Sequence, residues 1–139
     1  MARVEKRHPA DANHDVVQIV GDAGYQRRPC AQCPWRVDLP PGIFPAEAFR
    51  ISAVTAYDAS MEQFACHMAG TEAASTCAGF VLRNSANNLG ARIAAMTGRL
   101  DPRKVSSPYP LYESYRAMAE ANGVDPADPV LKRCRDDWS

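Results

Sequence analysis

The arrangement of cysteines is the feature that most restricts how this chain can fold. Cys30 and Cys33 are separated by two residues in RRPCAQCPWR, and Cys66 and Cys77 follow after 32 and ten further residues. A C-x-x-C turn lets two sulfurs bind one tetrahedral ion, because backbone N–H groups of the turn point at the sulfurs. A second pair from a distant segment closes a structural zinc site in this way. The spacing therefore predicts one metal site that joins residues 30–33 to residues 66–77.

Disulfides are the least favoured use of these thiols. The chain has five cysteines, an odd number, and its first residues, MARVEKRHPADANHD, contain no apolar segment typical of a secretory signal. No apolar run approaches the roughly 18 residues of a membrane-spanning helix. We therefore expect a soluble cytoplasmic protein, in a compartment whose reducing conditions favour metal ligation or redox chemistry over structural disulfides.

A thioredoxin-like redox pair is the competing interpretation of C-x-x-C. Such enzymes place the pair after a strand and at the start of a helix. The run VVQIVG (residues 16–21) does predict a strand before the pair. However, Pro34 and the proline-rich DLPPGIFP that begins at Asp38 leave no room for the required helix. The sequence thus favours a metal site.

Zinc is the expected metal, with a [4Fe-4S] iron–sulfur cluster as the alternative. Both bind four thiolates, and a Cys-Pro dipeptide is also typical of cluster loops. Four thiolates on a divalent ion leave about two negative charges, which Arg27, Arg28, Arg36 and the start of the helix near Cys77 could offset. Trp35 is predicted to cover the site.

His67 adjoins Cys66, and adjacent side chains rarely bind the same ion. We favour Cys66 as the ligand, because a thiolate matches its three partners in softness. His67 then orients or shields the site as a neighbouring donor. In the alternative, His67 is the ligand in place of Cys66. Cys134 lies in a charged stretch without a nearby cysteine, and we predict that it takes no part in the site.

The hydrophobic pattern predicts a small, mainly helical α+β domain organised around one metal site. We expect a flexible N-terminal arm (residues 1–15) and one metal-binding domain (16–139), with a motif core (28–100) and a helical extension (105–139). Helices are predicted after Pro45, from Cys77 to about Gly98, and over 111–123. The second has an apolar stripe that predicts a buried face: Leu82, Ala86, Leu89, Ile93, Met96 and Leu100.

Charge and motifs exclude several classes of function. The 16 basic and 16 acidic residues cancel, which argues against nucleic-acid or membrane binding. The polar run RNSANNLGAR is better explained as the outer face of a helix. The sequence contains no Ser-His-Asp order, phosphate-binding glycine loop or H-E-x-x-H motif. We therefore favour a non-enzymatic role.

Four motifs in order, PCAQCPWR, PPGIFPAEAFR, FACHM and CAGFVLR, resemble an uncharacterised family of small cysteine-containing proteins from actinobacteria and their phages. The resemblance covers residues 28–98, and Cys134 lies outside it. It implies that Cys30, Cys33, Cys66, His67 and Cys77 form the functional set, and it implies no activity.

We accordingly expect a small metal-binding protein in which a cysteine-ligated zinc site stabilises an interaction or regulatory module. The module meets a protein partner through the loop surface that the metal holds. The alternative is a redox or sensing protein with a [4Fe-4S] cluster.

Overall fold

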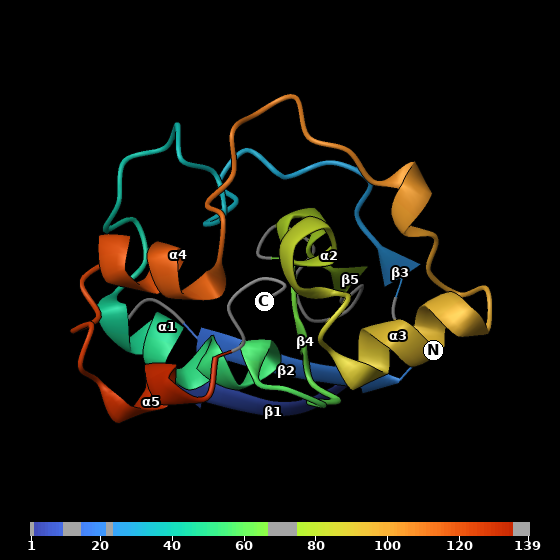
Figure 1. The fold of residues 1–139 in the computed structure, drawn as a ribbon, viewed down its shortest axis with the longest axis horizontal. Coiled ribbons are helices and arrows are strands. Elements are labelled where there is room, and N and C mark those ends of the chain that lie inside the picture. The colour runs from blue at the N-terminus through green and yellow to red at the C-terminus, as the bar shows by residue number, and fades with distance from the viewer. Residues whose placement is uncertain (1, 10–14, 22–23, 67–74, 135–139) are drawn as a thin grey trace.

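The computed structural model of the chain describes residues 2–9, 15–21, 24–66 and 75–134, and side chains in residues 24–66 and 75–134. The strands are β1 (Ala2–Pro9), β2 (Asp15–Gly21), β3 (Gly24–Tyr25), β4 (Gln63–Phe64) and β5 (Ser75–Thr76). The helices are α1 (Ala46–Ser52), α2 (Ala78–Asn84), α3 (Leu89–Met96), α4 (Tyr115–Ala121) and α5 (Pro129–Lys132), with the shorter 3-10 helices η1 (Ala53–Ala56) and η3 (Pro102–Lys104). The fold is a small α+β fold, as the sequence predicts (Figure 1).

The longer sheet is antiparallel, in the order β1-β2-β4. β1 pairs with β2 from Ala2 opposite Gly21 to Pro9 opposite Asp15. For residues 1–15 we expected a flexible arm, because they show no apolar period. In the structure Ala2–Pro9 is an edge strand, since β2 is rich in β-branched residues and offers its backbone N–H and C=O groups along that edge.

The shorter sheet brings together the three segments that carry the predicted ligands. β3 pairs in parallel with β5, and the Gln26 N–H donates to the Thr76 carbonyl at 2.9 Å. On the other side of β5, Ala65 forms an antiparallel bridge with Thr76. The loop with the first cysteine pair therefore starts next to Cys66 and Cys77.

Several predicted helix boundaries are confirmed. α1 begins directly after Pro45, and α2 begins directly after Cys77. α4 begins later than the predicted start at residue 111: it follows Ser114, whose hydroxyl accepts a hydrogen bond from the Ala117 N–H at 3.0 Å. Beyond α4, Gly123 has a φ of 100°, a left-handed conformation in which glycine commonly ends a helix.

The prediction of one long helix from Cys77 to about Gly98 is wrong. The helix stops after Asn84 and restarts as α3 after Asn88. The Asn88 side chain is fully buried, donates to the carbonyls of Thr55 (3.1 Å) and Glu62 (2.7 Å), and accepts from the Ala91 N–H (2.9 Å). The break is stable because this one amide starts α3 and pairs two buried carbonyls at the same time.

The predicted buried stripe is also wrong along α3. Leu89, Ile93 and Met96 are exposed, at 38%, 36% and 83% of their accessible area, whereas the small residues of the opposite face are buried: Gly90, Ala91 and Ala94. The small face is buried because α3 lies very close to the loop that precedes β4. A Cβ added to Gly90 would lie 2.6 Å from the Met61 carbonyl oxygen.

The largest fully buried side chains come from all parts of the described chain: Trp35, Tyr115, Phe49, Phe80, Met118 and Leu131. Figure 1 shows α1, α4 and α5 at one end of the molecule, α3 and β3 at the other, and α2 with β5 between them. Within the described segments, no helix has the length and apolar character that crossing a membrane requires.

Candidate metal centre

The loop after β3 forms two consecutive turns around the first cysteine pair. The Cys33 N–H donates to the Cys30 carbonyl at 3.2 Å, and the Arg36 N–H donates to the Cys33 carbonyl at 3.1 Å. In addition, the Gln32 N–H donates to the Cys30 sulfur and the Trp35 N–H donates to the Cys33 sulfur. The turns thus direct backbone N–H groups at both sulfurs, as the C-x-x-C spacing predicts.

Cys66 and Cys77 lie on one face of a short antiparallel ladder. The Cys66 N–H donates to the Ser75 carbonyl at 2.7 Å, and the Cys77 N–H donates to the Phe64 carbonyl at 2.9 Å. This register places Cys66 opposite Ser75, and Cys77 is two residues beyond Ser75. Because side chains alternate along a strand, both cysteines face the same way at diagonal positions.

The four sulfurs are linked by a chain of contacts. Cys30 hydrogen bonds with both Cys33 and Cys66, and the Cys33 and Cys77 sulfurs lie 3.6 Å apart. A disulfide bond would require about 2.05 Å, and all the cysteines are present as thiols. Cys30 is partly exposed and the other three are buried. We refer to Cys30, Cys33, Cys66 and Cys77 as the four-thiol group.

The contacts within the four-thiol group raise the pKa of Cys30 and of Cys33. The hydrogen bond to Cys33 has the largest effect on Cys30 and, together with burial, raises the pKa of its thiol. At Cys33 the hydrogen bond from Cys30 lowers the pKa. The hydrogen bond to Cys77, burial and the charge of Cys77 outweigh it, so that the pKa is raised far above the usual range. A metal ion would have to displace these protons, because the thiolate is the ligand.

The sulfurs are connected pairwise and do not surround one point. Across residues 24–66 and 75–134, no three His, Cys, Asp or Glu side chains are arranged so that they could hold a metal ion as they stand. The order of contacts is Cys66, Cys30, Cys33, Cys77. In a tetrahedral site the first and last sulfurs of this series of contacts would also have to lie close to each other. Those sulfurs belong to Cys66 and Cys77, which face the same way at the bridge between Ala65 and Thr76.

Arg36 holds the turn of the first pair from outside. Its guanidinium donates to the Cys30 carbonyl at 3.3 Å and to the Asp38 carboxylate at 2.9 and 2.7 Å. It also stacks on the ring of Tyr109, 3.5 Å from the centroid. The side chain is only 11% exposed. Of the three arginines predicted to offset the charge of the site, Arg36 contacts the turn, whereas Arg27 and Arg28 are exposed.

Trp35 is fully buried and packs against all three segments that carry the four-thiol group. It follows Cys33, and its ring makes an edge contact with Phe64, with centroids 6.2 Å apart. It also lies against α2, where a Cβ on Gly79 would come within 2.5 Å of the Trp35 Cβ. The indole thus fixes the spacing between these segments, while its predicted role as a cover of a metal site stays a prediction.

Sequence reasoning missed two residues of this arrangement. Gly79 was quoted only as part of a motif, although an isolated glycine in a helical pattern is a signal of close approach. Tyr115 makes an edge contact with Trp35, with centroids 5.9 Å apart. Its hydroxyl donates to the Phe49 carbonyl at 2.7 Å and lies 2.7 Å from the Ser52 hydroxyl. No local pattern in the sequence indicates that contact.

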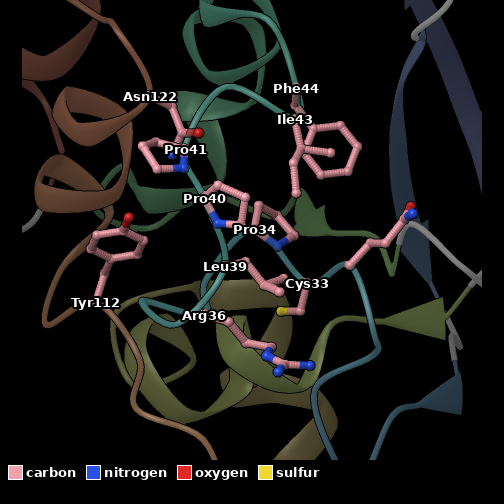
Figure 2. Close-up of a pocket in the computed structure, with 11 residues that line it drawn as sticks. Cys33, Pro34, Arg36, Leu39, Pro40, Pro41, Ile43, Phe44, Tyr112 and Asn122 are labelled. Atoms are coloured by element: carbon pink, nitrogen blue, oxygen red, sulfur yellow. The ribbon is translucent and has the colours of Figure 1, made fainter.

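A small, open pocket with an accessible volume of about 10 Å³ lies beside the first cysteine pair. Figure 2 shows the Cys33 side chain and Pro34 on one side of it, with the proline-rich loop and Tyr112 around the rest. The loop contributes Leu39, Pro40, Pro41 and Ile43. Near the pocket, Val37 (46% exposed) and Ile43 (37%) add apolar surface.

Of the two remaining candidates, the structure describes Cys134 but not His67. Cys134 is 6% exposed, and its sulfur lies 3.8 Å from the carbonyl oxygens of Ala53 and Val130. It belongs to the hydrophobic core, not to a solvated charged stretch as its neighbours in sequence suggested. His67 lies outside the described residues, so its role stays a prediction.

The fold and this arrangement define a class: a small α+β protein with four thiols from three segments gathered behind a buried tryptophan. The chain belongs to the Family of unknown function (DUF6283), whose profile matches residues 25–135. The match extends past residues 28–98, where we recognised the motifs, and includes Cys134. The chain matches no curated protein and no solved structure.

Proposed function

We propose that this chain is a metal-binding protein in which Cys30, Cys33, Cys66 and Cys77 hold one Zn²⁺ ion. The observation that carries the proposal is the chain of contacts between these four thiols, which come from three separate segments. Four soft donors are the usual set of a closed structural zinc site. Because the ligands are distant in sequence, metal binding would contribute directly to folding.

The spacing of the sulfurs favours a single ion over an iron–sulfur cluster. With zinc–sulfur bonds of about 2.3 Å, the sulfurs of a tetrahedral site lie about 3.8 Å apart. The distance of 3.6 Å between the Cys33 and Cys77 sulfurs is close to that value. A [4Fe-4S] cluster inserts irons and sulfides between its cysteines and would keep their sulfurs further apart. The cluster is therefore the second candidate.

The proposed role of the metal is structural. A zinc ion with four thiolate ligands keeps no open position for a substrate, so we propose no catalysis at this site. The ion would hold the turn of Cys33 against α2 and thereby fix the apolar pocket formed by Pro34 and the proline-rich loop. We propose that this pocket receives a protein partner, because an apolar concave surface held by rigid elements is typical of binding sites.

The surroundings support four thiolates on one ion. Backbone N–H groups of Gln32 and Trp35 already point at two of the sulfurs, and Arg36 holds the Cys30 carbonyl. Such donors and cations stabilise the negative charge of a thiolate site. We also propose a cytoplasmic location, because the reducing conditions there keep clustered thiols available for metal binding.

The test is metal analysis of the protein purified without oxygen. We expect one zinc per chain and cobalt spectra with charge-transfer bands from four sulfurs. Cys30→Ser, Cys33→Ser, Cys66→Ser and Cys77→Ser should each lose metal, because one ligand is removed from a closed site. Cys134→Ala is the matched control. It removes the fifth cysteine, which packs against Ala53 and Val130, and should retain full metal content.

Three results would contradict the proposal in different ways. A brown protein that contains iron and sulfide would replace zinc with a cluster. Retention of zinc in all four serine variants would show that these four cysteines are not the ligands. His67→Ala should keep four sulfurs and weaken binding by about 10- to 100-fold, as is typical when a neighbouring donor is lost. If instead His67→Ala abolishes binding and Cys66→Ser leaves the cobalt spectrum unchanged, the ligands are three cysteines and His67.

A further inference from the structure

The outer face of α3 is an exposed apolar strip. Leu89, Ile93 and Met96 are spaced by four and three residues, so they lie along one side of the helix. They are 38%, 36% and 83% exposed. Single exposed apolar residues are ordinary on protein surfaces, but a contiguous row on one helix is typical of a contact site.

Packing explains why α3 cannot rotate to hide this strip. Gly90 faces the Met61 carbonyl so closely that a Cβ would lie 2.6 Å from its oxygen. Ala91 and Ala94 complete this buried small face, at 0% and 9% exposure. Larger side chains would not fit there. The sequence therefore keeps three large apolar residues on the outside although smaller polar residues would suffice for the helix.

The segment that carries the strip is rich in basic residues. Residues 83–104 contain five arginines and lysines and one acidic residue, Asp101, although the whole chain has no net charge. Asp101 is paired with Arg103 at 3.0 Å. The exposed Arg92 lies on α3 next to the strip, and the exposed Lys104 lies on η3.

A second basic segment lies at the same end of the molecule. The Ser106 N–H donates to the Arg27 carbonyl at 3.0 Å. This contact places the exposed Arg27 and Arg28 beside the end of η3, and Figure 1 shows β3 and α3 at that end. This end of the molecule thus combines an apolar strip with several exposed basic side chains.

We propose that the outer face of α3, formed by Leu89, Ile93, Met96 and Arg92, binds an acidic amphipathic helix of a partner protein. Such a helix would place apolar side chains on the strip and Asp or Glu against the arginines, which accounts for both features of the surface. A second copy of the chain fits less well. A two-fold dimer through this face would bring Arg92 and its basic neighbours in one copy against the same residues of the other copy. Repulsion between these like charges disfavours such a dimer. This surface is separate from the pocket beside Cys33 and does not depend on the metal proposal.

The test uses a displayed library of helices of about 15 residues, with randomised apolar and polar positions, selected against the purified full chain. We expect the selected helices to carry Asp and Glu beside an apolar row. A synthetic copy of one selected helix should shift amide signals of residues 89–104 in NMR titrations. Ile93→Ser with Met96→Ser, and separately Arg92→Glu, should each weaken binding by about ten-fold or more.

Val37→Ser is the matched control, because Val37 is an apolar residue of similar exposure (46%) that lies outside α3, in the loop after the first cysteine pair. It should leave the affinity unchanged. All three variants change exposed side chains, and thermal melting will verify that they fold. Selected helices rich in Lys or Arg, or equal binding to the α3 variants, would overturn the proposal. So would stronger binding to duplex DNA, RNA or anionic vesicles than to the acidic helix, or self-association that Ile93→Ser abolishes.

Discussion

The close approach of Trp35 to Gly79 provides the sharpest test of how this fold holds its thiols. In Gly79→Ala the new Cβ would lie 2.5, 2.6 and 2.9 Å from the Cβ, Cγ and Cδ1 atoms of Trp35. An alanine inside a helix normally gains up to about 1 kcal/mol over glycine. Overpacking a buried site costs about 1–3 kcal/mol, and Trp35 is completely buried. We expect a net destabilisation of about 1–2 kcal/mol.

Thermal melting of the purified protein measures this change. For a chain of this size, about 1 kcal/mol corresponds to roughly 3 °C in Tm, so we expect a decrease of about 3–6 °C. Displacement of the indole should also move Cys33, two residues away, relative to Cys77. We therefore expect zinc to be lost to a competing chelator about ten-fold more readily in the variant, an effect typical of changes around the ligands.

Gly24→Ala is the control for replacing glycine as such. A Cβ at Gly24 meets no atom within 4 Å, so its melting temperature and metal retention should stay close to those of the parent. A Gly79→Ala protein that melts at or above the parent temperature would refute the reasoning. It would mean that Trp35 does not pack against the start of α2.

Three further predictions concern parts of the same framework. Asn88→Ala should lower the free energy of unfolding by about 2–4 kcal/mol, measured by urea denaturation, because two buried carbonyls and the start of α3 lose their partner. Asn88→Asp, which keeps the cap but not the amide donors, should recover only part of this loss. Tyr115→Phe should cost about 1–3 kcal/mol in the same assay, since it leaves the buried Phe49 carbonyl without its donor, and an unchanged midpoint would contradict it. Removal of zinc by a chelator should speed amide hydrogen exchange in residues 24–36 and 75–84, and protection equal to that of the zinc-loaded protein would argue against a metal that contributes to folding.

The turn at the first cysteine pair could be predicted from the sequence because its signal is local. The spacing of Cys30 and Cys33 specifies a turn that directs N–H groups at sulfur, and the turn forms as expected. The strand before the pair and the helix starts after Pro45 and Cys77 also follow from short patterns of β-branched residues and proline. A turn or a cap involves few residues, so few competing contacts can override it.

The path of the chain between these points could not be predicted in the same way. The large residues of α3 show a clear helical period, which normally marks a buried face. Its orientation, however, is decided by Gly90, since only that face can approach the Met61 carbonyl. The break before α3 depends likewise on Asn88 and the carbonyls of Thr55 and Glu62, which are 33 and 26 residues away in sequence. Contacts between residues so far apart produce no periodic pattern in the sequence.

Cys134 shows how charge in the sequence can mislead about position. It lies between Arg133 and Arg135, which suggested a solvated stretch. Its backbone instead forms a bridge with Tyr57, and the Arg133 guanidinium stacks on that tyrosine, 4.7 Å from the ring centroid. The arginine covers the aromatic ring from outside while the thiol of the next residue points into the core. Arg133 ends α5 and Cys134 follows it in a bridge with Tyr57, so the two side chains point in different directions. A buried cysteine next to an arginine therefore requires no metal to explain its burial.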